Sequence, residues 1–262
     1  MGRITEEKTA EDKFTEDWSR YQRQMLIRDF GKEGQRRLRR AKVLLVGAGG
    51  LGSPVALYLA GAGIGQLGII DADEVSLSNL HRQVLHPTGN LGKNKAESAA
   101  ERLSELNDQV KVVTYPFFLT EENAEKIIAC YDFVVMAVDN FETRFLINDI
   151  CVRLRKPFCH GGIVALDGQV MTYLPGQGPC YRCIFEEVPE EGSVPTAATV
   201  GVLGPAVGVI GSIQALEVIK YFTGIGELLT GKMFLFDGLT MKSRIIRMPH
   251  PVTNCRACGK QL

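Results

Sequence analysis

The chain has 262 residues, 45% of them hydrophobic, and its 30 Lys and Arg residues balance 30 Asp and Glu residues. This composition is typical of a soluble globular protein, and the length suits one α/β domain with an extension. Without an overall basic field, the chain is not expected to bind nucleic acid or a membrane. The arginine cluster at residues 36–40 is typical of a solvated helical face.

The sequence also limits the cellular compartment. No apolar run approaches the roughly twenty residues that span a bilayer, and the polar residues 1–12 are unlike a signal peptide. We therefore expect a cytoplasmic protein, in which the seven cysteines are free thiols, metal ligands or catalysts rather than disulfides.

The N-terminal part is expected to form a tail and a helix. Residues 1–15 are charged and poor in apolar side chains, so we expect a mobile tail that becomes helical near residue 16, ahead of a single domain over residues 16–262. Between Trp18 and Leu38, apolar residues recur at helical spacing, which predicts an amphipathic helix that Gly31 and Gly34 interrupt. This helix is expected to lie on the sheet or on a second subunit.

The stretch over residues 43–82 has the pattern strand, glycine turn, helix, strand and acid. Apolar residues at 43–46 and 67–70 predict the two strands, and the second ends on Asp71. A glycine turn lets the backbone approach a phosphate, and the following helix presents free N–H groups to that anion. Asp71 lies nineteen residues past Gly52, where an acid can bond a ribose hydroxyl. The pattern predicts a nucleotide site whose phosphate turn contains Gly47, Gly49, Gly50 and Gly52.

Helices and strands then alternate, which predicts a parallel sheet with helices on both faces. Up to residue 157 we expect a polar loop or short helix at 75–83, a turn at 89–92, helices at 93–106, 120–129 and 141–155, and strands at 110–115 and 133–138. The pattern changes near residue 158. Beyond it we expect strand and turn over 163–174 with a hairpin turn at 166–169, a mobile acidic crossing loop at 186–199, a helix at 204–222 and strands at 232–236 and 243–248.

Two Cys-x-x-Cys pairs form a second candidate site. Each pair presents two thiolates within one turn, and two such turns can supply a tetrahedral Zn²⁺ site from Cys180, Cys183, Cys255 and Cys258. The 71 residues between the pairs exceed the usual spacing of compact zinc modules, so two unrelated thiol pairs or one redox pair remain alternatives. Structural zinc is favoured. The other three cysteines are expected to be small buried side chains: Cys130, Cys151 and Cys159.

A third set of polar residues follows the carboxyl ends of the expected strands: Asp71, Asn79, Arg82, Lys95 and Asp139. Any one of them could be a surface residue. Together, their cations can neutralise a triphosphate while a carboxylate holds Mg²⁺ opposite it. A hydride-transferring enzyme does not need so many cations and a magnesium-type acid around one site.

With these residues the chain resembles the ThiF/MoeB/HesA family of adenylyltransferases, relatives of the ubiquitin-activating enzymes. The resemblance extends over residues 21–259 and is carried by Tyr21-Gln22-Arg23-Gln24, the glycine turn at 47–52, Asp71-Ala72-Asp73, the run from Ser76 to Gln83, Gly92-Lys93-Asn94-Lys95, Asp139-Asn140 and both cysteine pairs. It implies an α/β fold: a Rossmann-like, doubly wound, mostly parallel sheet continued by antiparallel strands, with a zinc site of four cysteines. A nucleotide-binding half over residues 41–157 would precede a carrier-binding and zinc half over residues 158–262.

In that family, ATP and Mg²⁺ activate the C-terminal glycine of a ubiquitin-like sulfur carrier, giving an acyl-adenylate and pyrophosphate. The resemblance therefore implies a homodimeric enzyme of molybdopterin or thiamine biosynthesis that acts on a carrier ending in Gly-Gly. By position, it implies a ribose-binding acid (Asp71), triphosphate contacts (Asn79, Arg82, Lys95), further nucleotide contacts (Ser78, Asn140), a magnesium-binding acid (Asp139) and an arginine that reaches into the partner's site (Arg23). The catalytic candidates are Arg23, Arg82, Lys95 and Asp139.

The chain departs from the family in the crossing loop. Many relatives carry there a cysteine that can take over the activated acyl group, and this chain has Ala197 at that position. Adenylation itself needs no thiol, because cations screen the approach of two anionic groups and the carboxylate is already ionised at neutral pH.

Two other functions remain open from the sequence. A Rossmann oxidoreductase using NAD explains the glycine turn and Asp71 but gives Arg82, Lys95 and Asp139 no function. A non-catalytic binding partner of the same fold explains the pattern too, although it does not require the complete set of candidate ATP contacts.

Overall fold

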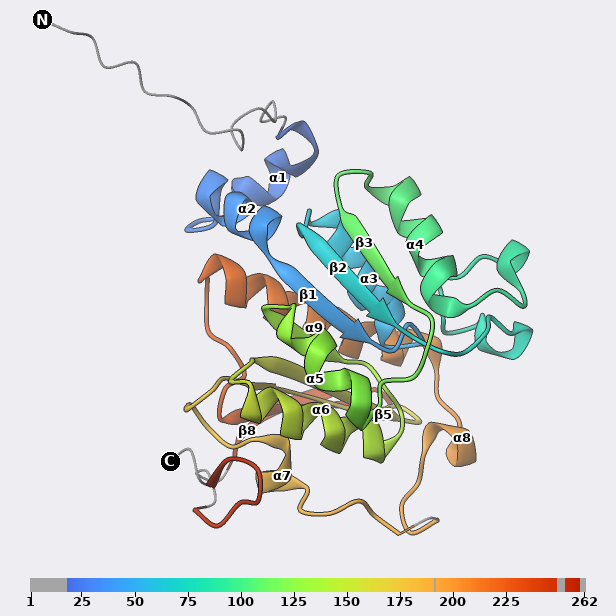
Figure 1. Ribbon diagram of the computed structural model, residues 1–262, viewed down its shortest axis with the longest axis vertical. Helices are drawn as coiled ribbons and strands as arrows, with labels where there is room; N and C mark the ends of the chain where they lie inside the picture. The colour runs from blue at the N-terminus through green and yellow to red at the C-terminus, as the bar shows by residue number, and fades with distance from the viewer. Residues whose placement is uncertain (1–17, 191, 249–252, 260–262) are drawn as a thin grey trace, which may run out of the picture.

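The computed structural model describes residues 18–190, 192–248 and 253–259. The tail expected over residues 1–15 and the helix start expected near residue 16 lie outside this range. Within it, eight strands form one sheet in the order β3-β2-β1-β4-β5-β6-β7-β8; Figure 1 shows β3, β2 and β1 side by side. The strands are β1 (Lys42–Val46), β2 (Gln66–Ile70), β3 (Lys111–Tyr115), β4 (Phe133–Met136), β5 (Phe158–Val164), β6 (Asp167–Tyr173), β7 (Lys232–Asp237) and β8 (Lys242–Arg247).

The sheet changes character at β5. Strands β3, β2, β1, β4 and β5 pair in parallel, whereas β5, β6, β7 and β8 pair antiparallel. The parallel half reverses its direction of winding between β1 and β4, so the loops after these strands leave in opposite directions. The expected mostly parallel sheet with an antiparallel continuation is therefore confirmed.

Helices cover both faces of the sheet. On one face, Val43 and Leu45 of β1 pack with α2 (Gly31–Arg40), α3 (Gly52–Gly61), α4 (Lys95–Leu106) and α9 (Gly204–Thr223). On the other face, Leu44 and Val46 pack with α5 (Glu121–Ala129), α6 (Phe141–Arg153) and α7 (Tyr181–Ile184). Successive side chains of a strand point to opposite faces, which explains why the apolar run of β1 serves two cores.

Helix α9 combines length and apolar character. It has 20 residues and is the one helix of the described chain that is long and apolar enough to cross a bilayer. Half of its apolar window is buried inside the protein, where it packs on α3 and β5 as a core helix does. The expectation that no apolar run has bilayer length is therefore wrong about length, and packing accounts for the apolar character of this helix.

The N-terminal helix is interrupted before Gly31, as expected, but not at Gly34. Residues expected in one amphipathic helix form a short 3-10 turn (Ser19–Tyr21), α1 (Gln22–Met25) and α2, which begins at Gly31. The break occurs where Asp29 and Gly31 have positive φ angles of 65° and 53°. Helical φ angles are negative, so the chain must turn there. Gly34, in contrast, lies inside α2 and packs against the Phe30 ring.

The hairpin turn lies two residues earlier than expected. Val164 pairs with Asp167, so the turn consists of Ala165 and Leu166, and Asp167 and Gly168 belong to β6. The Asp-Gly pair suggests a turn from sequence. Here the glycine serves close packing, because a Cβ on Gly168 would lie 2.3 Å from the Ile210 side chain of α9.

Candidate functional site

A cavity of about 240 Å³ lies at the carboxyl ends of β1, β2 and β4. This is the point where the strand order reverses, and open α/β sheets bind their ligands at such points. The cavity brings together eight of the site residues expected from sequence: Gly47, Gly49, Gly50, Asp71, Arg82, Lys95, Asp139 and Asn140. Gly52, Ser78, Asn79 and Arg23 do not line it.

The glycine turn between β1 and α3 is shaped by close backbone contacts. Gly47 has a φ of 95°, and a Cβ there would lie 2.6 Å from the Ala137 carbonyl oxygen after β4. A Cβ on Gly52 would lie 2.0 Å from the Gly47 carbonyl oxygen. Only glycine fits at residue 52 against this carbonyl, and the Ser53 N–H in the first turn of α3 donates to the Gly49 carbonyl at 2.9 Å.

Asp71 joins the glycine turn to the next loop. Its Oδ2 accepts a hydrogen bond from the Ala48 N–H at 2.8 Å, and its Oδ1 accepts one from the Asp73 N–H at 2.9 Å. Burial raises the pKa of Asp71, while these hydrogen bonds and the charge of Lys95 act in the opposite direction. The carboxylate is thus held in a fixed orientation at the rim of the cavity.

Lys95 is a buried cation at the start of α4. Its side chain is 5% exposed, and its Nζ lies 2.9 Å from Oδ2 of Asp73. The Asn94 side chain caps α4 by accepting a hydrogen bond from the Ala96 N–H at 2.9 Å, and it donates to the Asp71 carbonyl. Asp73, expected from sequence only as part of a motif, therefore holds the Lys95 ammonium group in place, and both side chains line the cavity.

His86 and Gln83 support the glycine turn, and neither was expected from sequence. The His86 ring contacts the Ala48 carbonyl oxygen through Nε2 at 2.8 Å and the Ser98 hydroxyl through Nδ1 at 3.0 Å. Burial lowers the pKa of His86, which favours the neutral ring. In that form Nε2–H donates to the Ala48 carbonyl oxygen. Gln83 lines the cavity, and its Oε1 has no hydrogen-bond partner among the described residues. Such a buried acceptor suits a ligand donor.

Ser78 and Asn79 act on Arg82 rather than on the cavity. The guanidinium of Arg82 donates from Nη2 to Oδ1 of Asn79 at 2.7 Å and from Nη1 to the Ser78 carbonyl at 3.3 Å. Asn79 is itself held by a 2.9 Å hydrogen bond to the Ser76 hydroxyl. These contacts fix the arginine side chain at the cavity. Ser78 and Asn79 therefore orient the guanidinium of Arg82, which lines the cavity, and do not line the cavity themselves.

The loop after β4 contributes Asp139, Asn140 and an unexpected arginine. Asn140 caps α6, because its Oδ1 accepts the Thr143 N–H at 2.8 Å. Asp139 is exposed, and its carboxylate makes no hydrogen bond or ion pair within the described residues. Arg144, on the first turns of α6, is buried and donates from Nε and Nη2 to the Val138 carbonyl at 3.2 and 3.0 Å. A lone arginine in a long helix carries no signal of such a role in sequence.

Arg23 lies away from the cavity of its own chain. Its helix, α1, is attached at the amino ends of the strands, where Gln24 donates to the Ala62 carbonyl just before β2. Figure 1 shows α1 at the end of the sheet opposite to the loops that line the cavity. Arg23 is exposed there. Within one chain the structure therefore does not bring this residue to the site.

The crossing loop reaches the cavity through α8 (Ala197–Val200). Ala197 and Ala198 line the cavity, together with Val202 and with Ile163 of β5. The position at which relatives carry a cysteine is therefore part of the cavity wall, and here it presents a methyl group.

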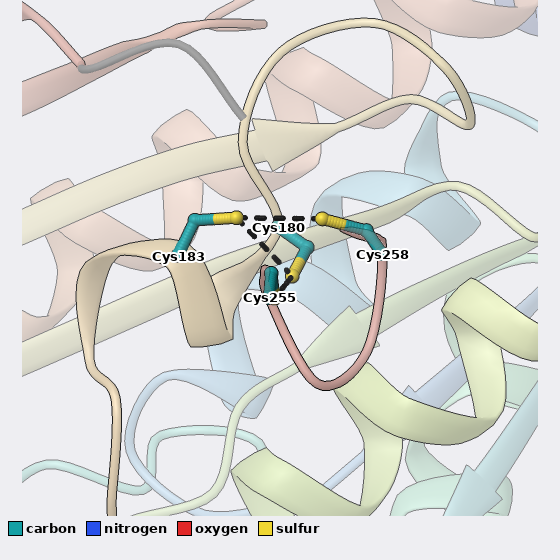
Figure 2. A group of neighbouring side chains, drawn as sticks. All are labelled: Cys180, Cys183, Cys255 and Cys258. Atoms are coloured by element: carbon teal, nitrogen blue, oxygen red, sulfur yellow. Dashed lines mark hydrogen bonds between the residues drawn. The ribbon is translucent and has the colours of Figure 1, made fainter. Parts of the chain in front are cut away.

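The two cysteine pairs meet in one cluster, as Figure 2 shows. The Sγ atoms of Cys180, Cys183, Cys255 and Cys258 all lie within 4.8 Å of one another. The individual Sγ distances are 3.9 Å for Cys180–Cys183, 3.7 Å for Cys180–Cys255 and 3.3 Å for Cys183–Cys258. Four thiolates around a tetrahedral Zn²⁺ at roughly 2.3 Å would be separated by about 3.8 Å, so the cluster has the donor set and size for zinc.

The cluster is not a set of disulfides, since all seven cysteines are free. Hydrogen bonding with Cys183, followed by burial, raises the pKa of Cys180, and burial raises the pKa of Cys258 to about 12. Four packed thiols of this kind release their protons when a cation binds. Outside the cluster, Cys151 and Cys159 are buried as expected, whereas Cys130 is exposed because it ends α5 at the surface. The expectation for Cys130 is therefore wrong.

Comparison with known proteins agrees with this geometry. Residues 21–257 match the ThiF family. The chain is 47% identical over 241 residues to "Adenylyltransferase and sulfurtransferase MOCS3-1" of Zea mays, covering 92% of the chain and 52% of that protein. It is 48% identical over 241 residues to the MOCS3 protein of Culex quinquefasciatus, covering 92% of the chain and 55% of that protein. The chain thus spans about half the length of the curated relatives it matches.

Solved structures give the same result. E. coli MccB in complex with MccA-N7isoASN superposes with a TM-score of 0.81 and 27% identity, covering 93% of this chain and 75% of that chain. MccB with ATP gives a TM-score of 0.77 at 27% identity, covering 87% of this chain and 70% of that chain. The fold, the composition of the cavity and the family match lead to one conclusion: this chain belongs to the ThiF family.

Proposed function

We propose that the chain transfers an adenylyl group from ATP to the C-terminal carboxylate of a ubiquitin-like sulfur carrier, with release of pyrophosphate. One observation carries the proposal: a glycine turn, an oriented acid, two fixed cations and an unpaired carboxylate surround one cavity at the reversal of the sheet. Family membership and relatives named as adenylyltransferases support it. An NAD-dependent oxidoreductase would leave Arg82, Lys95 and Asp139 unexplained.

The contacts of each residue suggest its task. Asp71 presents a carboxylate for the ribose hydroxyls, and the turn after Gly47 presents backbone N–H groups to the phosphates. Arg82 and Lys95 supply positive charge, which screens the repulsion between the attacking carboxylate and the α-phosphate and stabilises the charge that develops there. The carrier carboxylate is ionised at neutral pH, so no general base is needed.

Two metal sites belong to the proposal. Asp139 would hold Mg²⁺ at the cavity, since its carboxylate makes no ion pair or hydrogen bond within the described chain. Bound Mg²⁺ neutralises phosphate charge. The four cysteines would hold Zn²⁺ in a closed tetrahedral site with a structural task, because no thiol position is left open for a substrate.

A second cavity supports the assignment of a protein tail as substrate. It measures about 840 Å³, is lined by the antiparallel strands and by Phe185 and Pro189, and shares Arg144 and Ile163 with the first cavity. A chain end lying there would meet the nucleotide where the two cavities adjoin. Relatives whose names join adenylyl and sulfur transfer favour a sulfur carrier ending in Gly-Gly, and molybdopterin biosynthesis over thiamine biosynthesis.

We further propose a cytoplasmic homodimer. Arg23 is exposed beside Leu26 and Ile27, whose side chains are 76% and 53% exposed, and a second copy of the chain would cover such apolar side chains. In a two-fold dimer, an arginine outside its own cavity can reach the partner's cavity. The division into a nucleotide half over residues 41–157 and a carrier half over residues 158–262 belongs to the same proposal.

Pyrophosphate exchange tests the proposed function. ATP, Mg²⁺ and labelled pyrophosphate are incubated with the protein, with and without a carrier ending in Gly-Gly, and exchange is expected only with the carrier. Replacing Asp139 or Arg82 by Ala is expected to lower exchange about 100-fold or more, as for other phosphate clamps. Asp108→Ala, which removes an exposed carboxylate in the loop before β3, is the matched control and should leave exchange unchanged.

The outcome that contradicts the proposal is equally clear. Absence of carrier-dependent exchange by the intact protein would remove the adenylyltransferase assignment. Retained carrier binding without exchange would indicate instead a non-catalytic binding module, and preferential binding of NAD over ATP would indicate an oxidoreductase.

A further inference from the structure

The two cavities adjoin at Arg144 and Ile163, the residues that line both of them. The first is the candidate nucleotide cavity, and the second is the cavity of about 840 Å³ along the antiparallel strands. Ile163 belongs to β5 and is apolar, whereas Arg144 belongs to α6 and is a cation that is only 9% exposed. Arg144 therefore brings positive charge to the place where the cavities meet.

The guanidinium of Arg144 is held in one orientation by its surroundings. Its Nε and Nη2 donate to the Val138 carbonyl at 3.2 and 3.0 Å. Its Cζ lies 5.1 Å from the centroid of the Phe141 ring, and Phe141 itself lines the second cavity. A guanidinium has more N–H donors than one carbonyl accepts, so donors remain for a ligand. The group is thus fixed before any ligand arrives, as a binding residue should be.

The charge of Arg144 is not compensated by an acid. None of the ion pairs between described residues includes it. Arg182, in contrast, pairs with Asp149 of the same helix at 2.6 Å. Arg144 lies in the first turns of α6, where the positive end of the helix dipole adds to its charge. Burial of an unpaired charge is costly, so an anionic ligand would supply what the chain lacks.

Two anions meet in the proposed reaction, the phosphates of ATP and the carboxylate of the carrier. Arg82 and Lys95 line the nucleotide cavity and not the second one, so the phosphates have cations of their own. Arg144 also reaches the second cavity, through which the carrier tail would enter. Its place at the junction therefore suits a carboxylate that arrives from the second cavity and must stop beside the nucleotide.

We propose that Arg144 binds the C-terminal carboxylate of the carrier and orients it for attack on the α-phosphate. The inference rests on the proposed function, because it takes ATP and a carrier tail as the ligands of the two cavities. One carboxylate oxygen accepts a hydrogen bond from the guanidinium, and the other forms the bond to the α-phosphorus. The bond from that phosphorus to the bridging oxygen breaks, and pyrophosphate leaves with the electron pair. No proton is transferred, because the carboxylate is already ionised.

The experiment removes the charge from each partner in turn. The probe is the carrier ending in Gly-Gly that supports pyrophosphate exchange, prepared with a C-terminal carboxylate or with a C-terminal carboxamide. Binding to the whole chain is measured by titration calorimetry without ATP. The unmodified protein should bind the carboxylate form about tenfold or more tightly than the carboxamide form, as expected of a charge-assisted hydrogen bond. In Arg144→Gln this preference should disappear.

Kinetics and nucleotide binding separate this role from a role in folding or in ATP binding. In Arg144→Gln, affinity for ATP–Mg²⁺ should stay close to that of the unmodified protein, while KM for the carrier in pyrophosphate exchange should rise about tenfold. Arg144→Lys keeps the positive charge but loses the forked donors, and should retain part of the preference for the carboxylate form.

Two variants serve as controls. Lys242→Gln removes a cation that lines the second cavity and not the first, and it should retain the preference for the carboxylate form. Arg153→Gln removes an arginine of the same helix whose side chain is 58% exposed and pairs with Glu125, and it should leave exchange unchanged.

The outcomes distinguish this inference from the proposed function. Equal affinity of the unmodified protein for the two carrier forms, or a full preference retained in Arg144→Gln, would overturn the inference alone. Loss of ATP affinity in Arg144→Gln with an unchanged preference would assign the residue to the phosphates and would overturn it too. Absence of carrier-dependent exchange by the unmodified protein would overturn the proposed function, and this inference with it.

Discussion

His160 is a buried histidine in an apolar setting. It lies on β5 with its ring against Tyr181 and Phe185, and neither ring nitrogen forms a hydrogen bond with a described residue. Burial, followed by the nearby charge of Arg144, lowers the pKa of His160 well below its usual value. The folded protein therefore holds this ring in its neutral form.

A pH dependence of stability follows from this shift. Because the folded-state pKa lies below the unfolded value of about 6.5, the unfolded chain binds the proton first. The contribution of His160 to stability is thus present above pH 6.5 and is lost as the pH falls below it, by up to about 1.4 kcal/mol per pH unit. Replacing His160 by Leu should reduce the change in the free energy of unfolding between pH 6.5 and pH 5, as measured by denaturant titration at each pH. His81→Gln, which removes an exposed histidine, should retain the full slope, and an equal slope in His160→Leu would contradict the assignment.

At the residue scale, the sequence predicts the residues whose task is local and misses those whose task depends on distant partners. Asp71 and Lys95 follow their strands and loops at recognisable positions, and both reach the cavity. Arg144 and His86 cannot be distinguished from surface or core residues in sequence, because their partners are the carbonyls of Val138 and Ala48, whose direction only the folded turns define. Asn79 was expected to contact the triphosphate directly, and its contact in the structure is with Arg82.

At the scale of elements, the cysteine cluster joins two segments that lie far apart in the chain. Residues 180–183 belong to the α7 turn and residues 255–258 to the C-terminal turn, and the four Sγ atoms provide the contact between them. A metal bound only by the folded arrangement stabilises the fold by mass action. The cluster should therefore contribute several kcal/mol to stability when loaded.

Metal content and thermal denaturation test this expectation. The purified protein should contain about one zinc ion per chain, and Cys258→Ser should remove the metal and lower the melting temperature by roughly 10 °C. Cys130→Ser provides the matched control, because Cys130 is an exposed thiol outside the cluster. A Cys258→Ser protein that melts with the unmodified chain would show that the cluster has no structural metal.

Elements with one strong local signal were predictable, and elements set by tertiary contacts were not. The apolar run at β4 and the period of α4 gave bounds within a few residues of those observed. The hairpin turn was predicted at the wrong residues because Gly168 is required for a close contact with the Ile210 side chain of α9. The local sequence pattern does not contain this tertiary contact. The break at Gly31 was predicted from sequence, whereas the positive φ of Asp29 was not, because Asp29 is not a glycine.

At the scale of the whole molecule, alternation of strands and helices predicts a wound sheet but not its order. The reversal between β1 and β4 gathers residues 47–50, 71–73 and 137–140 around one cavity, although they lie far apart in the chain. From sequence, the positions of Asp71 and Asp139 after their strands indicate that these residues share one edge of the sheet, but the strand order that brings them together is not contained in the local pattern. Arg23 lies outside the cavity of its own chain, so the proposed role of this residue requires the proposed two-fold dimer.

Mixed dimers test whether Arg23 acts across an interface. Chains carrying Arg23→Ala and chains carrying Asp139→Ala are coexpressed with different affinity tags, and the heterodimer is isolated through both tags. If Arg23 serves the partner, the cavity of the Arg23→Ala chain has its own Asp139 and receives an intact arginine from the other chain, while the second cavity lacks both groups. The heterodimer should then recover about half of the exchange rate of the unmodified dimer, although each homodimeric variant is nearly inactive. If Arg23 acted within its own chain, each cavity would lack one group and no activity would return. A monomeric protein in solution, or a heterodimer as inactive as its parents, would contradict the proposed role.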